Sequence, residues 1–138
     1  MVILHCCRDY KYNTPVKPKA VVSFFGPTDL TALFNTNILA ALILAQVVGT
    51  LPAANATLYQ QSSPSTFVTT STPPTLLLHA GADPLVPPAQ ATLLQTLLNN
   101  AGVTNQYVFY PSEGHGWTGA NLDDSFVKIA AFLNAHVN

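Results

Sequence analysis

Two polar residues, Asp83 and His115, stand where a carboxylate and an imidazole could act as a pair. Asp83 follows the apolar run at residues 74–80 in a short loop, and His115 follows the next apolar run at residues 106–110. A carboxylate that accepts the imidazole Nδ1–H fixes the tautomer of the ring and leaves Nε2 free as a base. The spacing therefore predicts acid–base chemistry. The alternative is a solvated loop aspartate and an ordinary exposed histidine.

The segments around this pair alternate between strand and helix patterns. Runs of apolar, β-branched and aromatic residues predict strands at residues 19–25, 74–80 and 106–110. Helical spacing of apolar residues predicts helices at residues 89–100 and from Asn121 towards the C-terminus. Strands separated by helices imply right-handed crossovers, so we expect an α/β fold with a parallel sheet flanked by helices. Ligands bind such sheets in the loops after the strands, here residues 26–30, 81–86 and 111–117.

The region between the first two predicted strands has two parts. Residues 38–48 are apolar apart from one glutamine, but they fall well short of the roughly 20 residues that a membrane span needs. This stretch therefore predicts a buried or lid-like helix. Residues 51–72 are rich in Pro, Ser, Thr and Asn and predict mostly loop, with a short helix near residues 65–68.

The length of 138 residues predicts one domain, residues 1–138. Hydrophobic residues make up 49% of the chain and charged residues 8%, which excludes intrinsic disorder. The net charge is −1 and no basic run is present, so we expect no nucleic-acid partner. The low share of charge also indicates that part of the apolar surface is covered in an assembly.

No segment predicts a targeting signal, a membrane span or a metal site. The apolar patch at the N-terminus is too short for a signal peptide, so we expect a cytoplasmic protein without membrane contact. The adjacent residues Cys6 and Cys7 give neither a disulfide framework nor the spacing of metal ligands. The four histidines and six acidic residues are scattered, and we therefore expect no metal and no cofactor.

The sequences of two loops resemble those in the C-terminal half of the α/β-hydrolases, especially the esterase/lipase and prolyl-oligopeptidase-like branches. The sequences LLLHAGADPLVPP and YVFYPSEGHGW are similar to the family's H-G-x-x-D-x-x-V-P and E-G-H-G-[FW] patterns, with Ala80 where the family usually has Gly. KAVVSFFGPTDL likewise looks like the family strand that comes after the nucleophile helix. The resemblance covers about residues 17–138. It implies that Asp83 is the catalytic acid and His115 the catalytic histidine.

The resemblance does not extend to the nucleophile of this family. That nucleophile is a serine within G-x-S-x-G, on a strained turn between a strand and a helix. No G-x-S-x-G occurs in the sequence. The first residues, up to Tyr10, look like the tail of the helix that follows this serine in the family. The resemblance therefore leads us to expect a chain that begins a turn or two after the family serine.

Other serine and cysteine residues are candidate nucleophiles in place of the family serine. Ser112 lies three residues before His115 and could contact it locally, although no strained turn presents it. Cys7 and Cys6 could supply a thiolate if their pKa were low, against the alternative of packing in a helix tail. Ser23 lies within a predicted strand, where a small core residue is the simpler interpretation.

Four further residues near the loops have both a functional and a structural interpretation. Trp117 and Glu113 could contact substrate; alternatively, Trp117 packs beside the catalytic loop and Glu113 braces it. Asp29 is expected to stabilise its own turn, and His79, at the end of a strand, to be a satisfied structural histidine.

The functional prediction is a hydrolase of small, activated carboxylic esters that uses the His115–Asp83 pair with a non-standard or missing nucleophile. Water, a serine or cysteine, or a residue of a second subunit would attack. The alternative is a catalytically inactive, truncated hydrolase fragment that acts as a self-associating structural unit. Loss of the family's neighbouring strand would leave residues 19–25 at a sheet edge and residues 38–48 uncovered. We therefore expect a homodimer with one of these segments in its interface.

Overall fold

A computed structural model describes residues 18–137 and shows a parallel sheet of three strands in the order β1-β2-β3. The strands are β1 (Val21–Phe24), β2 (Thr75–Ala80) and β3 (Asn105–Tyr110). Each begins and ends within two residues of its predicted bounds. The expected α/β fold with a parallel sheet is confirmed. In the described chain β1 pairs with β2 alone, so its other side is a sheet edge.

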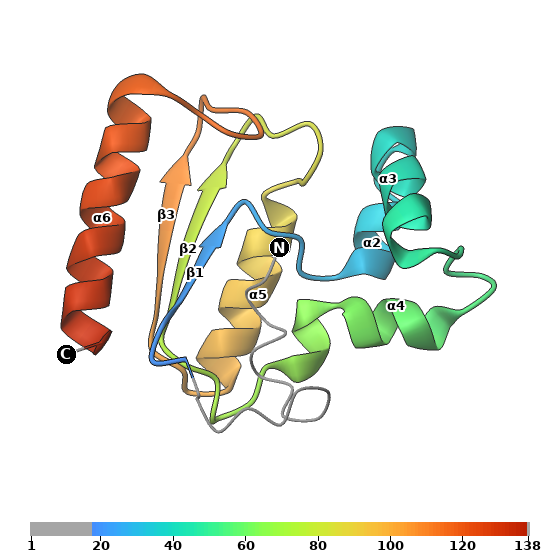
Figure 1. Ribbon diagram of the computed structural model, residues 1–138, viewed down its shortest axis with the longest axis horizontal. Helices are drawn as coiled ribbons and strands as arrows, with labels where there is room; N and C mark the ends of the chain where they lie inside the picture. Colours follow the sequence, from blue (N-terminus) through green and yellow to red (C-terminus); the bar gives the residue numbers. More distant parts are fainter. Residues whose placement is uncertain (1–17, 138) are drawn as a thin grey trace.

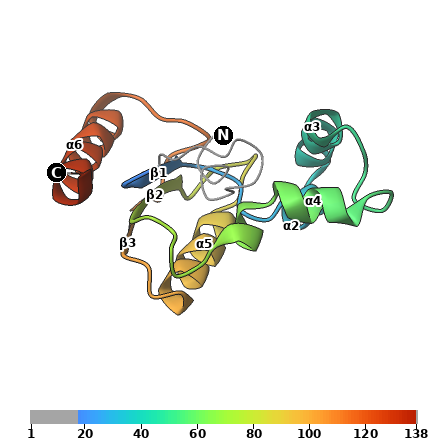
Figure 2. The ribbon, with the colours of Figure 1, turned by 60° about the horizontal axis from the view of Figure 1, so that its bottom comes forward.

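Helices cover both faces of the sheet and form a separate group at one side (Figure 1). α5 (Ala89–Asn100) lies against one face and α6 (Gly119–Val137) against the other. The group consists of α2 (Leu30–Phe34), α3 (Ile38–Val48), α4 (Ala56–Ser62) and the 3-10 turn η2 (Pro64–Phe67). Figure 2 shows this group on the side of α5 away from α6.

Strand β2 is buried along its whole length, which explains its continuous apolar sequence. Leu76 and Leu78 pack in the cluster on the α6 side, together with Phe132. Leu77 points the other way and packs against Leu94 of α5. The alternation of side chains along one strand thus builds both halves of the core.

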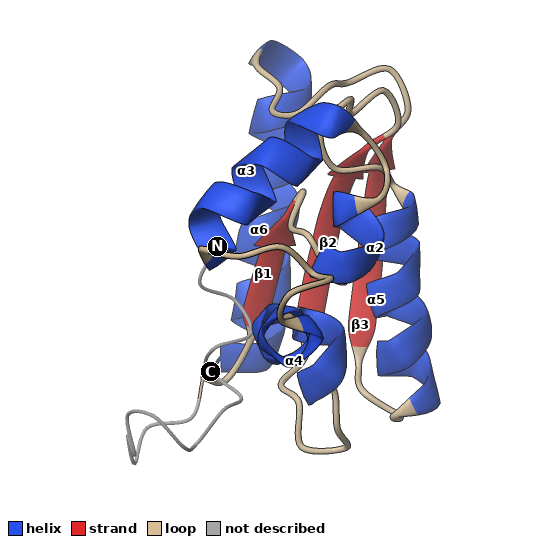
Figure 3. Ribbon diagram, turned by 90° about the vertical axis from the view of Figure 1, so that its right-hand side faces the viewer, coloured by secondary structure: helices blue, strands red, loops and turns tan. Residues whose placement is uncertain are grey.

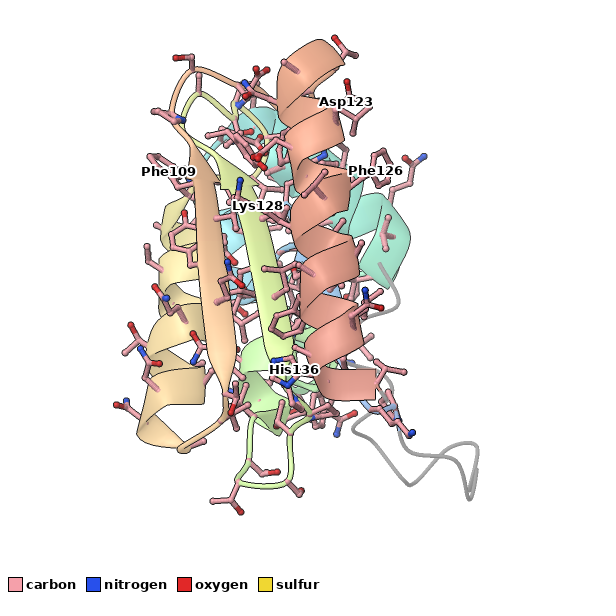
Figure 4. All side chains as sticks on the ribbon, turned by 90° about the vertical axis from the view of Figure 1, so that its left-hand side faces the viewer. Phe109, Asp123, Phe126, Lys128 and His136 are labelled. Atoms are coloured by element: carbon pink, nitrogen blue, oxygen red, sulfur yellow. The ribbon has the colours of Figure 1, made fainter. Side chains whose placement is uncertain are left out.

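Helix α6 begins at Gly119, two residues before the predicted start. Ser125 and Phe132 face the core, whereas Phe126 and Asp123 are exposed. Figure 4 shows Phe126 projecting away from the sheet, and Phe109 on the opposite side of β3 from α6. Lys128 and Asp124 form an ion pair one turn apart along α6.

The prediction of a loop at residues 51–72 is wrong for α4. Asn55 caps this helix by accepting a hydrogen bond from the Leu58 N–H at 3.0 Å. Tyr59 is fully buried, and its hydroxyl donates to the Thr50 carbonyl at 3.0 Å. Local composition favoured a loop, but the cap and the burial of one aromatic ring stabilise a helix instead.

A helix, α3, forms at residues 38–48 as predicted, and it lies on the outside of the molecule (Figure 3). Of the two interpretations, a buried or a lid-like helix, the first is wrong and the second stays a prediction. The N-terminus of α3 is capped by Asn37, whose side chain accepts from the Ala40 N–H at 2.8 Å. Only Ala40 and Leu44 are buried. The exposed apolar residues of this helix are Ile38, Leu39, Leu42, Ile43 and Val47. Between residues 18 and 137, no helix is both long and apolar enough to cross a membrane.

Candidate active site

Asp83 and His115 meet at the carboxyl ends of β2 and β3. The ladder between these strands continues into the loops, because Gly81 N–H donates to the Tyr110 carbonyl and Ala82 N–H to the Glu113 carbonyl, both at 2.9 Å. His115 Nδ1 lies 2.8 Å from Asp83 Oδ2. The two side chains are therefore within hydrogen-bond distance, as the loop positions predict.

Gly81 permits the close approach of the two loops. A Cβ atom at this position would lie 2.4 Å from the Pro111 carbonyl oxygen and 2.8 Å from its Cα. Both are backbone atoms that cannot turn aside. A glycine is therefore needed for the loop that carries Asp83 to lie against the loop that carries His115.

The carboxylate of Asp83 is held on both oxygens. Oδ1 accepts from the backbone N–H of Leu85 at 2.9 Å and of Val86 at 2.8 Å, while Oδ2 accepts from His115. The side chain is 0% exposed. Between Asp29 and Glu113, Asp83 is the only residue among Asp, Glu, Lys and Arg. A lone buried carboxylate with three fixed donors is positioned to orient an imidazole.

A second histidine, His79, also lies near Asp83. Its Nε2 is 3.9 Å from Asp83 Oδ2 and 2.9 Å from the Val86 carbonyl oxygen. Burial lowers the pKa of His79, although the Val86 bond and the charge of Asp83 oppose this. The neutral ring donates its Nε2–H to the Val86 carbonyl. The Asp83 carboxylate therefore accepts its side-chain hydrogen bond from His115 and not from His79. His79 is thus a satisfied structural residue, as predicted.

Phe25 is a part of the site that sequence reasoning missed. Its ring centroid lies 4.7 Å from that of His115, and it also packs edge-on to Trp117 at 5.4 Å. Its backbone φ is 40°, a left-handed conformation that costs a bulky residue energy. This strained turn brings an aromatic ring into contact with the imidazole. The pattern Phe-Phe-Gly-Pro indicates the end of a strand but gives no signal for that conformation.

Trp117 is buried in the core on the α6 side. Its Nε1–H donates to Ser125 Oγ at 2.9 Å, and that oxygen lies 3.0 Å from the Tyr110 hydroxyl. The Tyr110 hydroxyl in turn donates to Asp124 at 2.8 Å. This network ties the loop of His115 to α6, a position that favours packing over contact with substrate.

Glu113 braces the same loop. Its Oε1 accepts from the Asn121 side-chain amide at 2.6 Å. Neither Glu113 nor Trp117 lines the cavity that His115 reaches. Their geometry therefore supports the structural interpretation, and contact with substrate stays a prediction.

A cavity of about 720 Å³ opens beside His115. Its wall is made by the end of β1, by α2, α3, α4 and η2, and by residues of the loop after β2 and of α5. Phe25 and His115 lie in this wall together with Ser23. The site thus joins an oriented imidazole to a largely apolar space.

The structure does not gather the candidate nucleophiles beside His115. Ser112 is exposed on the loop after β3 and does not line the cavity. Ser23 lines the cavity but is largely buried on β1. Cys6 and Cys7 lie outside the described residues. Within the part of the chain that the structure describes, no three His, Cys, Asp or Glu side chains group to hold a metal.

Comparison with known proteins gives a consistent family. Residues 4–98, more than half of the chain, match the BD-FAE family, a range that includes Asp83 and ends before His115. The chain is 30% identical over 101 residues to the esterase LipQ of Mycobacterium tuberculosis, covering 72% of this chain and 24% of LipQ.

Solved structures show the same fold. A truncated form of a carbohydrate esterase from gut microbiota has a TM-score of 0.71 and 25% identity, with 87% of this chain and 44% of that chain covered. A puromycin-hydrolyzing peptidase of M. tuberculosis has a TM-score of 0.73 and 26% identity, with 84% and 18% covered. The chain thus spans less than half the length of each of these relatives. Its sequence and its sheet place it in the BD-FAE family, with a partial α/β-hydrolase fold.

Proposed function

We propose that this protein hydrolyses carboxylic esters, with His115 as general base and Asp83 as the residue that orients it. The observation that carries the proposal is the 2.8 Å contact between His115 Nδ1 and an Asp83 carboxylate whose other oxygen is fixed by two backbone N–H groups. The family and the esterases among the relatives support the reaction class.

In the proposed reaction, Nε2 of His115 takes the proton of an attacking O–H or S–H group as its oxygen or sulfur bonds to the ester carbonyl carbon. The bond from that carbon to the alcohol oxygen then breaks, and the imidazolium returns the proton to the departing alkoxide. Asp83 stabilises the positive ring between these steps. Water would complete the hydrolysis directly, or would release the acyl group from a serine or cysteine.

The attacking group is the open part of the mechanism. Water, Ser112, Cys6, Cys7 or a residue of a second subunit are the candidates. The transition state of ester hydrolysis carries negative charge on the former carbonyl oxygen, the oxyanion. A hydrolase that lacks one hydrogen-bond donor to this oxygen loses about 10²–10³ in rate. We therefore propose that the chain acts best on activated esters, whose good leaving groups need less help in the transition state.

Turnover of p-nitrophenyl acetate by the purified chain tests the proposal. In His115→Ala the rate should fall to that of buffer, because the general base is gone. His136→Ala is the matched control: this histidine lies on α6, with its ring on Phe132, and its loss should leave the rate unchanged. Equal rates in the wild type and in His115→Ala would overturn the proposal.

The alternative function, self-association as a structural unit, is favoured by the outer face of α3. This face carries Ile38, Leu39 and Leu42, which are exposed apolar side chains. No Asp, Glu, Lys or Arg occurs between Asp29 and Asp83, so α2, α3 and α4 carry no charged side chain that burial of this face would remove from water. Burial stabilises by roughly 25 cal/mol per Å² of apolar surface before the cost of association. We propose that a second copy of this chain covers the face.

Light scattering at micromolar concentration measures this association. The wild type should have the mass of a dimer, and Leu42→Gln should shift it towards 14.7 kDa, the mass of one chain. A wild-type monomer would contradict the homodimer. A dimer that turns over no ester would favour the structural function over the enzymatic one.

A further inference from the structure

We propose that the cavity beside His115 binds an uncharged, aliphatic chain of the substrate, so that the preferred esters are neutral and carry a long alkyl group. This inference rests on the proposed ester hydrolysis. It deepens that function by naming the class of substrate that the site accepts.

The chemistry of the described wall disfavours a charged ligand group. Among the residues between 18 and 137 that line the cavity there is no Asp, Glu, Lys or Arg, and most are aliphatic or aromatic. The polar members are Ser23, Gln61, Ser62 and His115. Moving a carboxylate or ammonium group from water into such a space is strongly unfavourable without a partner. An alkyl chain, in contrast, gains from leaving water.

Branched aliphatic side chains make up the part of the wall that comes from α2 and α3. These residues are Leu30, Leu33, Ile43, Leu44, Val47 and Val48. The volume of about 720 Å³ falls within the range of about 300–1,000 Å³ that is usual for small-molecule sites. Such a space holds a flexible chain in contact with many methyl groups.

The placement of His115 connects this space to the reaction. His115 and Phe25 line the same cavity, and their rings are in contact with a centroid distance of 4.7 Å. A substrate whose alkyl chain fills the cavity would therefore hold its ester group near the imidazole. Positioning of this kind lowers the entropy cost of the reaction.

Two adjacent residues of α3 differ in whether they line the cavity. Ile43 lines it and is 39% exposed, whereas Leu42 does not line it and is 63% exposed. Replacing either by glutamine adds the same polar group to the same helix. The pair therefore distinguishes a ligand site from a general effect on α3.

The experiment measures binding without chemistry, by calorimetric titration with two methyl ketones that mimic the ester but cannot be hydrolysed. The wild type should bind 2-nonanone and show no measurable binding of 2-butanone, whose chain is too short to fill the cavity. In Ile43→Gln the Kd for 2-nonanone should rise about tenfold, because a polar group then lines the alkyl site. In Leu42→Gln it should stay unchanged even where this variant is a monomer, because Leu42 does not line the cavity.

Two results would overturn the inference: equal binding of the long and short ketones by the wild type, or equal loss of binding in the two variants. Circular dichroism of both variants confirms that α3 remains folded. Failure of the proposed function looks different, since 2-nonanone would still bind while no ester is turned over. Turnover that depends on His115 but not on alkyl length would keep the function and remove this inference.

Discussion

The loops after β2 and β3 differ sharply from the helices α2–α4 in whether their side chains have partners. At the carboxyl ends of the strands, both oxygens of Asp83 have donors, His79 at the end of β2 has the Val86 carbonyl, and Trp117 has Ser125. In the helices, α3 has apolar residues towards the cavity and further apolar residues towards solvent.

This difference indicates which part of the described chain is self-sufficient. The acid–base pair is assembled on the loops of adjacent strands, and α6 holds the loop of His115 through Ser125 and Asn121. The helical group leaves apolar surface on two sides, which is the property expected of a region that meets a ligand or a second chain.

The largest effect should come from changing the self-sufficient part, in Asp83→Asn. If Oδ1 keeps its bonds to the Leu85 and Val86 N–H groups, the new NH₂ points at His115 Nδ1. The imidazole must then carry its proton on Nε2, where it can no longer act as a base. Ester turnover should fall by about 10³–10⁴ in kcat, measured with p-nitrophenyl acetate.

Asp123→Asn is the control for this substitution, because the Asp123 carboxylate is exposed on α6. It should leave the rate unchanged. Wild-type activity in Asp83→Asn would show that the pair is structural.

A second substitution compares the packing of the two regions. Leu78 lies in the buried centre of the sheet, and Leu44 lies beside a cavity in the helical group. Truncation costs most where the surroundings cannot relax, so Leu78→Ala should lower the free energy of unfolding by about 4–5 kcal/mol and Leu44→Ala by about 2 kcal/mol. Urea titration measures both. Equal losses would show that the helical group is packed as tightly as the sheet.

The two regions also differ in how far the sequence predicts them. The strands and α5 follow directly from apolar runs and from the Pro and Gly residues at their ends, because these patterns reflect burial within the same domain. The meeting of Asp83 and His115 follows from consecutive parallel strands. These parts need only local patterns and one rule of topology.

Other features depend on contacts that no local pattern encodes. The helix α4 depends on the burial of Tyr59 against residues of α2 and α3, far away in the sequence. The positive φ of Phe25 depends on the space between β1 and the loop of His115. The roles of Trp117 and Glu113 depend on partners in α6 whose position no motif specifies.

The loop that carries His115 offers a smaller test of its rigidity. Gly116 has a φ of 93°, whereas Gly114 has no positive φ and the nearest atom to an added Cβ lies 4.0 Å away. Gly116→Ala should lower the free energy of unfolding by about 1–2 kcal/mol, because an L-residue is strained in that conformation. Gly114→Ala should leave it nearly unchanged. Thermal unfolding of both variants checks this, and equal stability would show that the loop relaxes freely.

The smallest effect concerns His79 and appears as a dependence of stability on pH. Burial lowers the pKa of His79 in the folded protein below its ordinary value of 6.5. Below that value the unfolded chain binds a proton that the folded chain does not, so the free energy of unfolding should decrease as the pH falls from about 7 to about 6. The decrease should be less than about 1 kcal/mol, since one proton changes the free energy by at most about 1.4 kcal/mol per pH unit.

His79→Gln should remove this part of the pH dependence, because its neutral amide can donate to the Val86 carbonyl without titrating. His136→Gln should retain it, since His136 lies on α6 against Phe132 and away from the buried pair. Urea titrations of the two variants at both pH values measure the difference. An unchanged pH dependence in His79→Gln would mean that the charge of Asp83, 3.9 Å from the His79 ring, offsets the effect of burial. The neutral state of His79 would then no longer explain why Asp83 is left to His115.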